Sequence, residues 1–301
     1  MNRDQSPNRQ SERHVPLAHS VSGERLRRYV LPSLVAAGSL GLLEIARSRY
    51  QASQVFEPTR YPLGQWDPAK EGLRYEDVEF LSEDGTKLHG WWFGHDGADM
   101  TLVYCHGNRG SIAERVEVFA SLLRLKVNVF AFDYRGYGKS EGSPSEQGVF
   151  ADARAAVDYA AARRDSGLRS VLLFGHSLGG AIAIDAALHR PVGGLVVQSS
   201  FTQLADMARH RHPDLPMHWI CRNEFRSIEK VPRLQMPKLF IHGGSDRTVP
   251  HEHGRALFEA AAKPKDFLSI AKADHNDVHL WGSLRYFSRL IRFRRRCSHG
   301  E

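Results

Sequence analysis

Ser177 stands at the centre of the stretch Gly175-His176-Ser177-Leu178-Gly179, which follows the apolar run at 171–174 and precedes a helical pattern. A strand, a sharp turn and a helix with serine at the apex expose the hydroxyl above a sheet, an arrangement called a nucleophile elbow. The flanking glycines suit this turn, because the serine backbone is strained and the strand and helix pass close together. The pattern therefore predicts a nucleophilic serine.

A serine hydroxyl is a weak nucleophile near neutral pH, so it needs a base, and the base needs a carboxylate to orient it. Asp246 follows the apolar run at 239–241, and His275 follows the last such run, at 267–270. Carboxyl ends of parallel strands meet at one edge of a sheet, so the three residues can converge there. We therefore predict a triad of Ser177, Asp246 and His275. The rival candidates are Asp274, Asp277, His251, His253 and His279.

The loop His106-Gly107-Asn108-Arg109-Gly110 follows the apolar run at 101–105. An oxyanion hole after a serine elbow takes one backbone N–H from such a loop and one from the residue after the serine. We assign these donors to Asn108 and Leu178, and a structural role to His106. The glycine-rich stretch at 133–142 lacks the spacing of a phosphate-binding loop, so we interpret it as a scaffold loop beside the pocket.

The elements that must position these residues alternate between strands and helices. A hairpin is expected from 78–81 and 88–93, followed by strands at 101–105, 127–132, 171–174, 195–197, 239–241 and 267–270. Helical patterns cover 112–123, 149–164, 180–189, 251–262 and 278–293. The strands are continuously apolar, which indicates a sheet covered on both faces. The alternation predicts an α/β fold with a mostly parallel sheet.

The 301 residues suffice for one large domain and a tail. The net charge of +7 comes with arginines clustered at both ends of the chain, but no nucleic-acid-binding module accompanies them. The three cysteines, Cys105, Cys221 and Cys297, show neither a disulfide framework nor a metal-ligand spacing. Cys105 falls in a strand pattern and is expected to be a buried, inert thiol. The sixteen histidines form no zinc motif, so no metal is implied.

The first part of the chain is predicted to lie outside the catalytic domain. Residues 1–28 are polar and basic and are expected to be disordered. Residues 29–46 hold a charge-free stretch at 30–43, which is shorter than the roughly 20 residues of a membrane span. This segment is read as a short membrane anchor, an interfacial helix or a helix packed on the domain, with a signal peptide disfavoured. A connecting segment at 47–74 leads to the domain at 75–293, and a basic tail follows at 294–301.

Together these motifs resemble the α/β-hydrolase superfamily, and more narrowly its serine-aminopeptidase-like branch, which includes lysophospholipases and depalmitoylases. The resemblance rests on 106–108, 133–138, 175–180, 244–246 and 274–277, and it extends over about 75–290. Residues 56–58 also look like the membrane-proximal start of some members. The resemblance implies an eight-stranded, mostly parallel sheet and hydrolysis of ester, thioester or amide bonds without a cofactor. It places a cap between 199 and 237, which is short.

The leading functional hypothesis is a serine hydrolase that cleaves ester or thioester bonds through an acyl-enzyme. A serine peptidase with the same mechanism and a non-catalytic membrane-associated scaffold are the alternatives. The expected partner is a small-molecule or lipid acyl substrate, with a membrane surface as a further candidate and no nucleic acid. The protein is expected in the cytoplasm or at a membrane, depending on the role of the apolar segment. The sequence does not identify the acyl group or the leaving group of the substrate.

Overall fold

The structure is a computed structural model, and it describes residues 55–163, 167–211, 214 and 225–299. By its contacts the chain divides into Met1–Ser48 and Arg49–Glu301, and all described residues belong to the second unit. The predicted basic tail at 1–28 and apolar segment at 29–46 lie outside the described residues, as do residues 212–213 and 215–224 of the predicted cap, which include Cys221.

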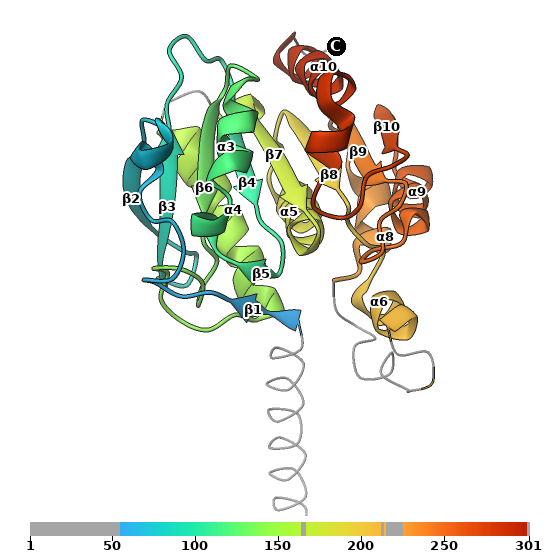
Figure 1. The fold of residues 1–301 in the computed structure, drawn as a ribbon, viewed down its shortest axis with the longest axis horizontal. Helices are drawn as coiled ribbons and strands as arrows, with labels where there is room; N and C mark the ends of the chain where they lie inside the picture. The colour runs from blue at the N-terminus through green and yellow to red at the C-terminus, as the bar shows by residue number, and fades with distance from the viewer. Residues whose placement is uncertain (1–54, 164–166, 212–213, 215–224, 300–301) are drawn as a thin grey trace, which may run out of the picture. The chain divides into compact units, whose positions relative to one another are not determined.

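An eight-stranded sheet forms the centre of the described unit, in the order β10-β9-β8-β7-β4-β6-β3-β2 (Figure 1). Its strands are β2 (Glu76–Leu81), β3 (Lys87–Phe93), β4 (Thr101–Cys105), β6 (Asn128–Phe132), β7 (Val171–His176), β8 (Gly194–Gln198), β9 (Lys238–Gly243) and β10 (Lys265–Ile270). The five pairs from β10 to β6 are parallel, whereas β3 pairs antiparallel with both β6 and β2. The predicted mostly parallel, eight-stranded α/β sheet is therefore confirmed.

Helices cover both faces of this sheet. They are α3 (Val116–Leu123), α4 (Glu146–Ala162), α5 (Leu178–His189), α6 (Leu204–Arg211), α8 (Ser227–Lys230), α9 (His251–Ala260) and α10 (Val278–His299). The side chains of α3 and α10 belong to one hydrophobic cluster, and those of α4, α5 and α9 belong to another. Along β4, Leu102 and Tyr104 join the first cluster while Val103 and Cys105 join the second. This division explains why the strands are apolar at every position.

The pattern at 112–123 predicts one helix, but the structure divides it. A 3₁₀ turn spans Ile112–Glu114, Arg115 leaves helical geometry with φ −130° and ψ 18°, and α3 then begins at Val116. The side chains explain the break. Ser111 and Glu114 form a reciprocal capping box that closes the first turn. The Arg115 guanidinium donates to the carbonyl oxygens of Ser111 and Arg109.

The last helix differs from the prediction at its C-terminal end. Residues 294–299, predicted as part of a tail, continue α10 to His299. Cys297 explains the extension, because its side chain is buried against Gly194 at the start of β8. The helix is kinked at Ser283, where φ is 39°. Gly282 precedes the kink and packs so closely on Tyr286 that a Cβ there would lie 2.6 Å from the Tyr286 Cβ.

The burial of Cys105 and the length and apolarity of the helices are separate features of the chain. Cys105 is fully buried, and burial raises the pKa of its thiol to about 12, which fits an inert thiol. Within the described part of the chain, every helix falls short of the length or the apolarity that crossing a membrane requires. The apolar stretch at 30–43 is outside that part.

Candidate active site

Ser177 sits in the turn between β7 and α5 with φ 56° and ψ −121°, in the positive-φ region that residues with a side chain rarely adopt. Gly175 and Gly179 make this turn possible. A Cβ on Gly175 would lie 2.3 Å from the Gly179 carbonyl oxygen, so strand and helix could not approach as they do. The Ser177 side chain does not cap α5, although it stands at the N-cap position. Its hydroxyl is therefore available for another partner.

That partner is His275. Its Nε2 lies 2.9 Å from Ser177 Oγ, and its Nδ1 lies 2.8 Å from Asp246 Oδ2. The three side chains come from the loops after β7, β9 and β10, at the carboxyl ends of parallel strands. All three residues are buried, with at most 8% of their surface exposed. The structure thus brings the predicted Ser177, His275 and Asp246 into one chain of hydrogen bonds.

Asp246 is held as an ionised acceptor. Its Oδ1 accepts the backbone N–H groups of Thr248 at 2.9 Å and Val249 at 2.8 Å, which leaves Oδ2 for His275. His242 Nε2 lies a further 3.4 Å from Oδ2. Burial would raise the pKa of Asp246, but the contacts with His242, His275 and Val249 outweigh it and hold this pKa well below its ordinary value. The carboxylate is therefore charged at neutral pH.

The rival candidates have other partners. Asp274 pairs with Arg247 and accepts the backbone N–H of His275, and Asp277 accepts that of Asp274. His251 contacts Ser269 Oγ, and His253 contacts Thr202 Oγ1. Among the described residues, no hydrogen bond joins these side chains or His279 to Ser177. Asp274 and Asp277 instead shape the loop that carries His275.

The two predicted oxyanion donors are Leu178, which follows Ser177 in the chain, and Asn108, which follows Gly107 in a neighbouring loop. Leu178 is the first residue of α5, so its N–H has no acceptor in a preceding turn and lies at the positive end of the helix dipole. Gly107 passes so close that a Cβ on it would lie 3.4 Å from the Ser177 Cβ, which brings the Asn108 loop against the serine. Within the described residues, no hydrogen bond takes the N–H of Asn108 or Leu178.

Glu57 is the residue near this site that the sequence interpretation missed. Its backbone N–H donates to the Asn108 carbonyl oxygen at 3.1 Å, and its carboxylate accepts Asn108 Nδ2 at 3.2 Å. The other carboxylate oxygen accepts Arg109 Nε at 2.9 Å. These bonds accompany the parallel pairing of β1 (Glu57–Pro58) with β5 (Arg109–Gly110). A two-residue strand carries no periodicity, so only the resemblance at 56–58 marked this position.

Asp133 is fully buried, and its Oδ1 lies 3.5 Å from His106 Nε2, in the loop at 106–110 that carries the predicted donor Asn108 and is called the oxyanion loop below. Its Oδ1 accepts the Ile112 N–H at 2.9 Å, but within the described residues Oδ2 has no hydrogen-bond partner. Burial raises the pKa of this carboxyl to about 7, against the lowering by Ile112 and Arg115. The folded protein therefore binds a proton here that the unfolded chain releases near pH 4.

We expect this proton to make stability depend on pH. Because the folded state binds it more tightly, Asp133 lowers the free energy of unfolding as pH rises from about 4 to about 7. Asp133→Asn cannot ionise, so the stability of wild type minus that of the variant should be larger at pH 5 than at pH 8. Urea unfolding of both proteins at the two pH values measures this difference. Asp274→Asn is the control. The pKa of Asp274 is lowered, so the stability of wild type minus that of this variant should be the same at pH 5 and pH 8. An equal difference for Asp133→Asn at both pH values would contradict the expectation.

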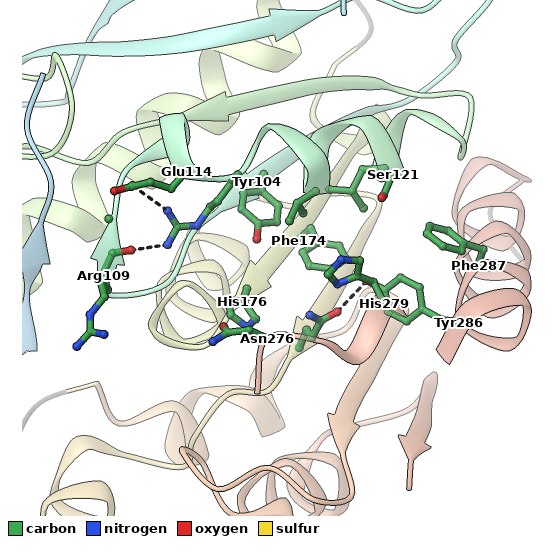
Figure 2. A pocket seen from close by; sticks show the side chains of 15 residues that line it. Tyr104, Arg109, Glu114, Ser121, Phe174, His176, Asn276, His279, Tyr286 and Phe287 are labelled. Atoms are coloured by element: carbon green, nitrogen blue, oxygen red, sulfur yellow. Dashed lines mark hydrogen bonds and ion pairs between the residues drawn. The ribbon is translucent and has the colours of Figure 1, made fainter. Parts of the chain in front are cut away.

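A cavity of about 400 Å³ lies between α3 and α10, close to the site (Figure 2). Its walls include Tyr104, Phe174 and Tyr286, together with His176 and Asn276. His176 and Asn276 are the chain neighbours of Ser177 and His275. Ser177 and His275 themselves do not line the cavity. The cavity therefore borders the candidate nucleophile without containing it. Within the described residues, no group of three or more His, Cys, Asp or Glu side chains could hold a metal ion.

Comparisons with known proteins agree with this architecture. Residues 101–220 match the alpha/beta hydrolase fold family. An uncharacterized protein of Mycobacterium tuberculosis is 35% identical over 262 residues, which cover 86% of this chain and 92% of that protein. The alpha/beta hydrolase domain-containing protein WAV2 of Arabidopsis thaliana is 32% identical over 254 residues, which cover 77% of this chain and 82% of WAV2.

A solved structure is also similar in fold. The esterase Pf2001 of Pyrococcus furiosus superposes with a TM-score of 0.69 at 23% identity, over 80% of this chain and 98% of the esterase. The sheet order, the matched region and the two relatives lead to one conclusion. The chain belongs to the alpha/beta hydrolase family.

Proposed function

We propose that the protein is a serine hydrolase that cleaves ester or thioester bonds through an acyl-enzyme intermediate. The observation that carries this proposal is the buried chain of hydrogen bonds from Ser177 through His275 to Asp246, of 2.9 and 2.8 Å. A nucleophile, a base and an orienting carboxylate are what acyl transfer to serine requires. The strained backbone of Ser177 supports the same role, as does its hydroxyl, which does not cap α5.

Each residue has a defined part in the proposed reaction. Ser177 Oγ attacks the acyl carbon while His275 Nε2 takes the serine proton. The N–H groups of Asn108 and Leu178 receive the oxyanion, and His275 returns the proton to the departing alcohol or thiol. Water then attacks the acyl-enzyme with His275 as the base, which releases the acid and restores Ser177. Asp246 holds the proton on His275 Nδ1 throughout and stabilises the imidazolium.

Labelling with a fluorophosphonate tests this proposal. We expect intact-mass analysis to show one adduct per wild-type molecule and none on Ser177→Ala, because only an activated serine attacks the phosphorus. Hydrolysis of acyl esters and thioesters of graded chain length should disappear in the same variant. Ser199→Ala is the matched control, since Ser199 is also buried but follows β8 and should leave labelling unchanged. Folded wild-type protein that takes no adduct would overturn the proposal.

The esterase among the structural neighbours supports testing esters before amides. Aminoacyl anilides belong in the same panel, because a peptidase of this mechanism would cleave them. Turnover of anilides with no turnover of any ester or thioester would replace the proposed substrate class while leaving the serine mechanism in place.

A further inference from the structure

The oxyanion loop presents three successive carbonyl oxygens to side-chain donors. The Tyr134 hydroxyl donates to the His106 oxygen at 3.0 Å, and His106 Nδ1 donates to the Gly107 oxygen at 2.7 Å. The Tyr137 hydroxyl donates to the Asn108 oxygen at 2.7 Å. All three donor side chains are completely buried. Among the described residues, no hydrogen bond joins these side chains to Ser177 or His275, so the proposed reaction leaves them without a role.

These bonds determine where the Asn108 N–H points. That N–H and the Gly107 carbonyl belong to one peptide group, which is planar and trans, so its N–H points opposite to its oxygen. The bond from His106 therefore sets the direction of the Asn108 N–H. On the other side of Asn108, the bond from Tyr137 and a 3.1 Å bond from the Glu57 N–H hold the next carbonyl. Asn108 is thus held at both of its peptide groups.

We infer that Tyr134, His106 and Tyr137 are positioning residues, which direct the Asn108 N–H toward the oxyanion by holding the carbonyl oxygens of residues 106–108. The inference rests on the proposed function and on Asn108 as an oxyanion donor. A preorganised donor needs no reorientation when charge develops, and that is the source of its contribution to catalysis. The segment at 133–138 thereby contributes to the reaction without contacting the substrate, through the hydrogen bonds of Tyr134 and Tyr137 to the loop.

The protonation states of the three donors agree with this role. Burial raises the pKa of Tyr134 and of Tyr137, so both hydroxyls keep their protons at neutral and alkaline pH. Burial lowers the pKa of His106 well below its ordinary value, with Arg115 and His176 acting in the same direction. Neutral His106 has one N–H, and the contact with Gly107 assigns it to Nδ1. Its ring packs against those of Tyr134 and Tyr137, with ring centroids 4.3 and 5.0 Å away.

Removing single hydroxyls tests the inference with little change in volume. Tyr137→Phe should lower kcat for an acyl ester about 10-fold and change KM less than 2-fold, because the donor is misdirected in the transition state while ground-state binding is kept. Tyr134→Phe acts on the neighbouring carbonyl and should give a smaller effect of the same kind. Tyr286→Phe is the control, since Tyr286 is equally buried but donates to the Gln198 side chain at 2.8 Å.

The affinity for a boronic acid provides a second readout, because the tetrahedral adduct on Ser177 places an oxygen where the oxyanion forms. We expect Tyr137→Phe to weaken this affinity by the same factor as kcat/KM, with a pH profile parallel to that of wild type. Melting temperatures measured beside these values separate stability from positioning. Equal effects of Tyr137→Phe and Tyr286→Phe on kcat and on boronic acid affinity would overturn the inference and leave the proposed function standing. An inactive, unlabelled wild-type protein would overturn both.

Discussion

Asp246→Asn should lower kcat for ester hydrolysis about 10⁴-fold while the protein stays folded. The structure determines how the new carboxamide must sit. Oδ1 of Asp246 already accepts the N–H groups of Thr248 and Val249, so an asparagine keeps its oxygen there. Its NH₂ group then takes the place of Oδ2, 2.8 Å from His275 Nδ1. An amide N–H facing Nδ1 drives the imidazole proton to Nε2, where it points at Ser177 and blocks acceptance of the serine proton.

Rates of ester hydrolysis and of fluorophosphonate labelling check this prediction, and both should fall together because both need the same base. Asp274→Asn is the matched control. Asp274 adjoins His275 and accepts its backbone N–H, but its side chain pairs with Arg247 at the surface. We expect its kcat to stay within about 10-fold of wild type. A kcat near wild type in Asp246→Asn, or a larger loss in Asp274→Asn, would move the orienting carboxylate to the neighbouring loop.

The sheet and the three hydrogen-bonded side chains could be predicted because their signals are local. Each of Ser177, Asp246 and His275 directly follows an apolar run of strand length, and parallel strands end at a common edge. The strand and helix periods are likewise visible within short windows, so the order of the eight sheet strands and of the helices α3, α4, α5, α9 and α10 was predicted with shifts of a few residues. The short elements β1, β5, α6 and α8 were not predicted. The resemblance implied eight strands, and the hairpin at 78–93 predicted the antiparallel pair of β2 and β3 but not the antiparallel pairing of β3 with β6.

The contacts around the oxyanion loop could not be predicted, because they join residues that no short pattern connects. Glu57 meets Arg109 across 52 positions, and Tyr137 meets Asn108 across 29. Side-chain hydrogen bonds of this kind depend on the finished packing. The break at Arg115 has a similar origin, since its guanidinium binds carbonyl oxygens of Ser111 and Arg109 in preference to a continuous helix. The end of α10 depends on the packing of Cys297 against Gly194. The arginines before Cys297 give this segment the composition of an exposed tail, so the sequence did not indicate that packing.

Gly179→Ala should remove both stability and activity, through a contact between backbones. A Cβ at this position would lie 2.0 Å from the Cys105 carbonyl oxygen and 2.5 Å from the His106 carbonyl oxygen. Backbone atoms at the end of β4 cannot rotate away as a side chain would, so α5 and the oxyanion loop must separate. Such overpacking costs about 1–3 kcal/mol or more in the free energy of unfolding. The displaced loop also carries Asn108, so we expect kcat to fall at least about 100-fold where the variant is still folded.

Urea unfolding and steady-state kinetics at a temperature where both proteins are folded measure the two losses. Gly94→Ala is the control, because a Cβ there would meet only Trp92 Nε1, at 3.7 Å, and should change the free energy of unfolding by less than about 0.5 kcal/mol. A Gly179→Ala protein as stable and active as wild type would mean that β4 and α5 lie farther apart than the structure has them. A stable but inactive variant would instead show that the fold absorbs the added methyl by moving the oxyanion loop alone. In that case the lack of a side chain at residue 179 matters for the position of the Asn108 N–H and not for the stability of the fold.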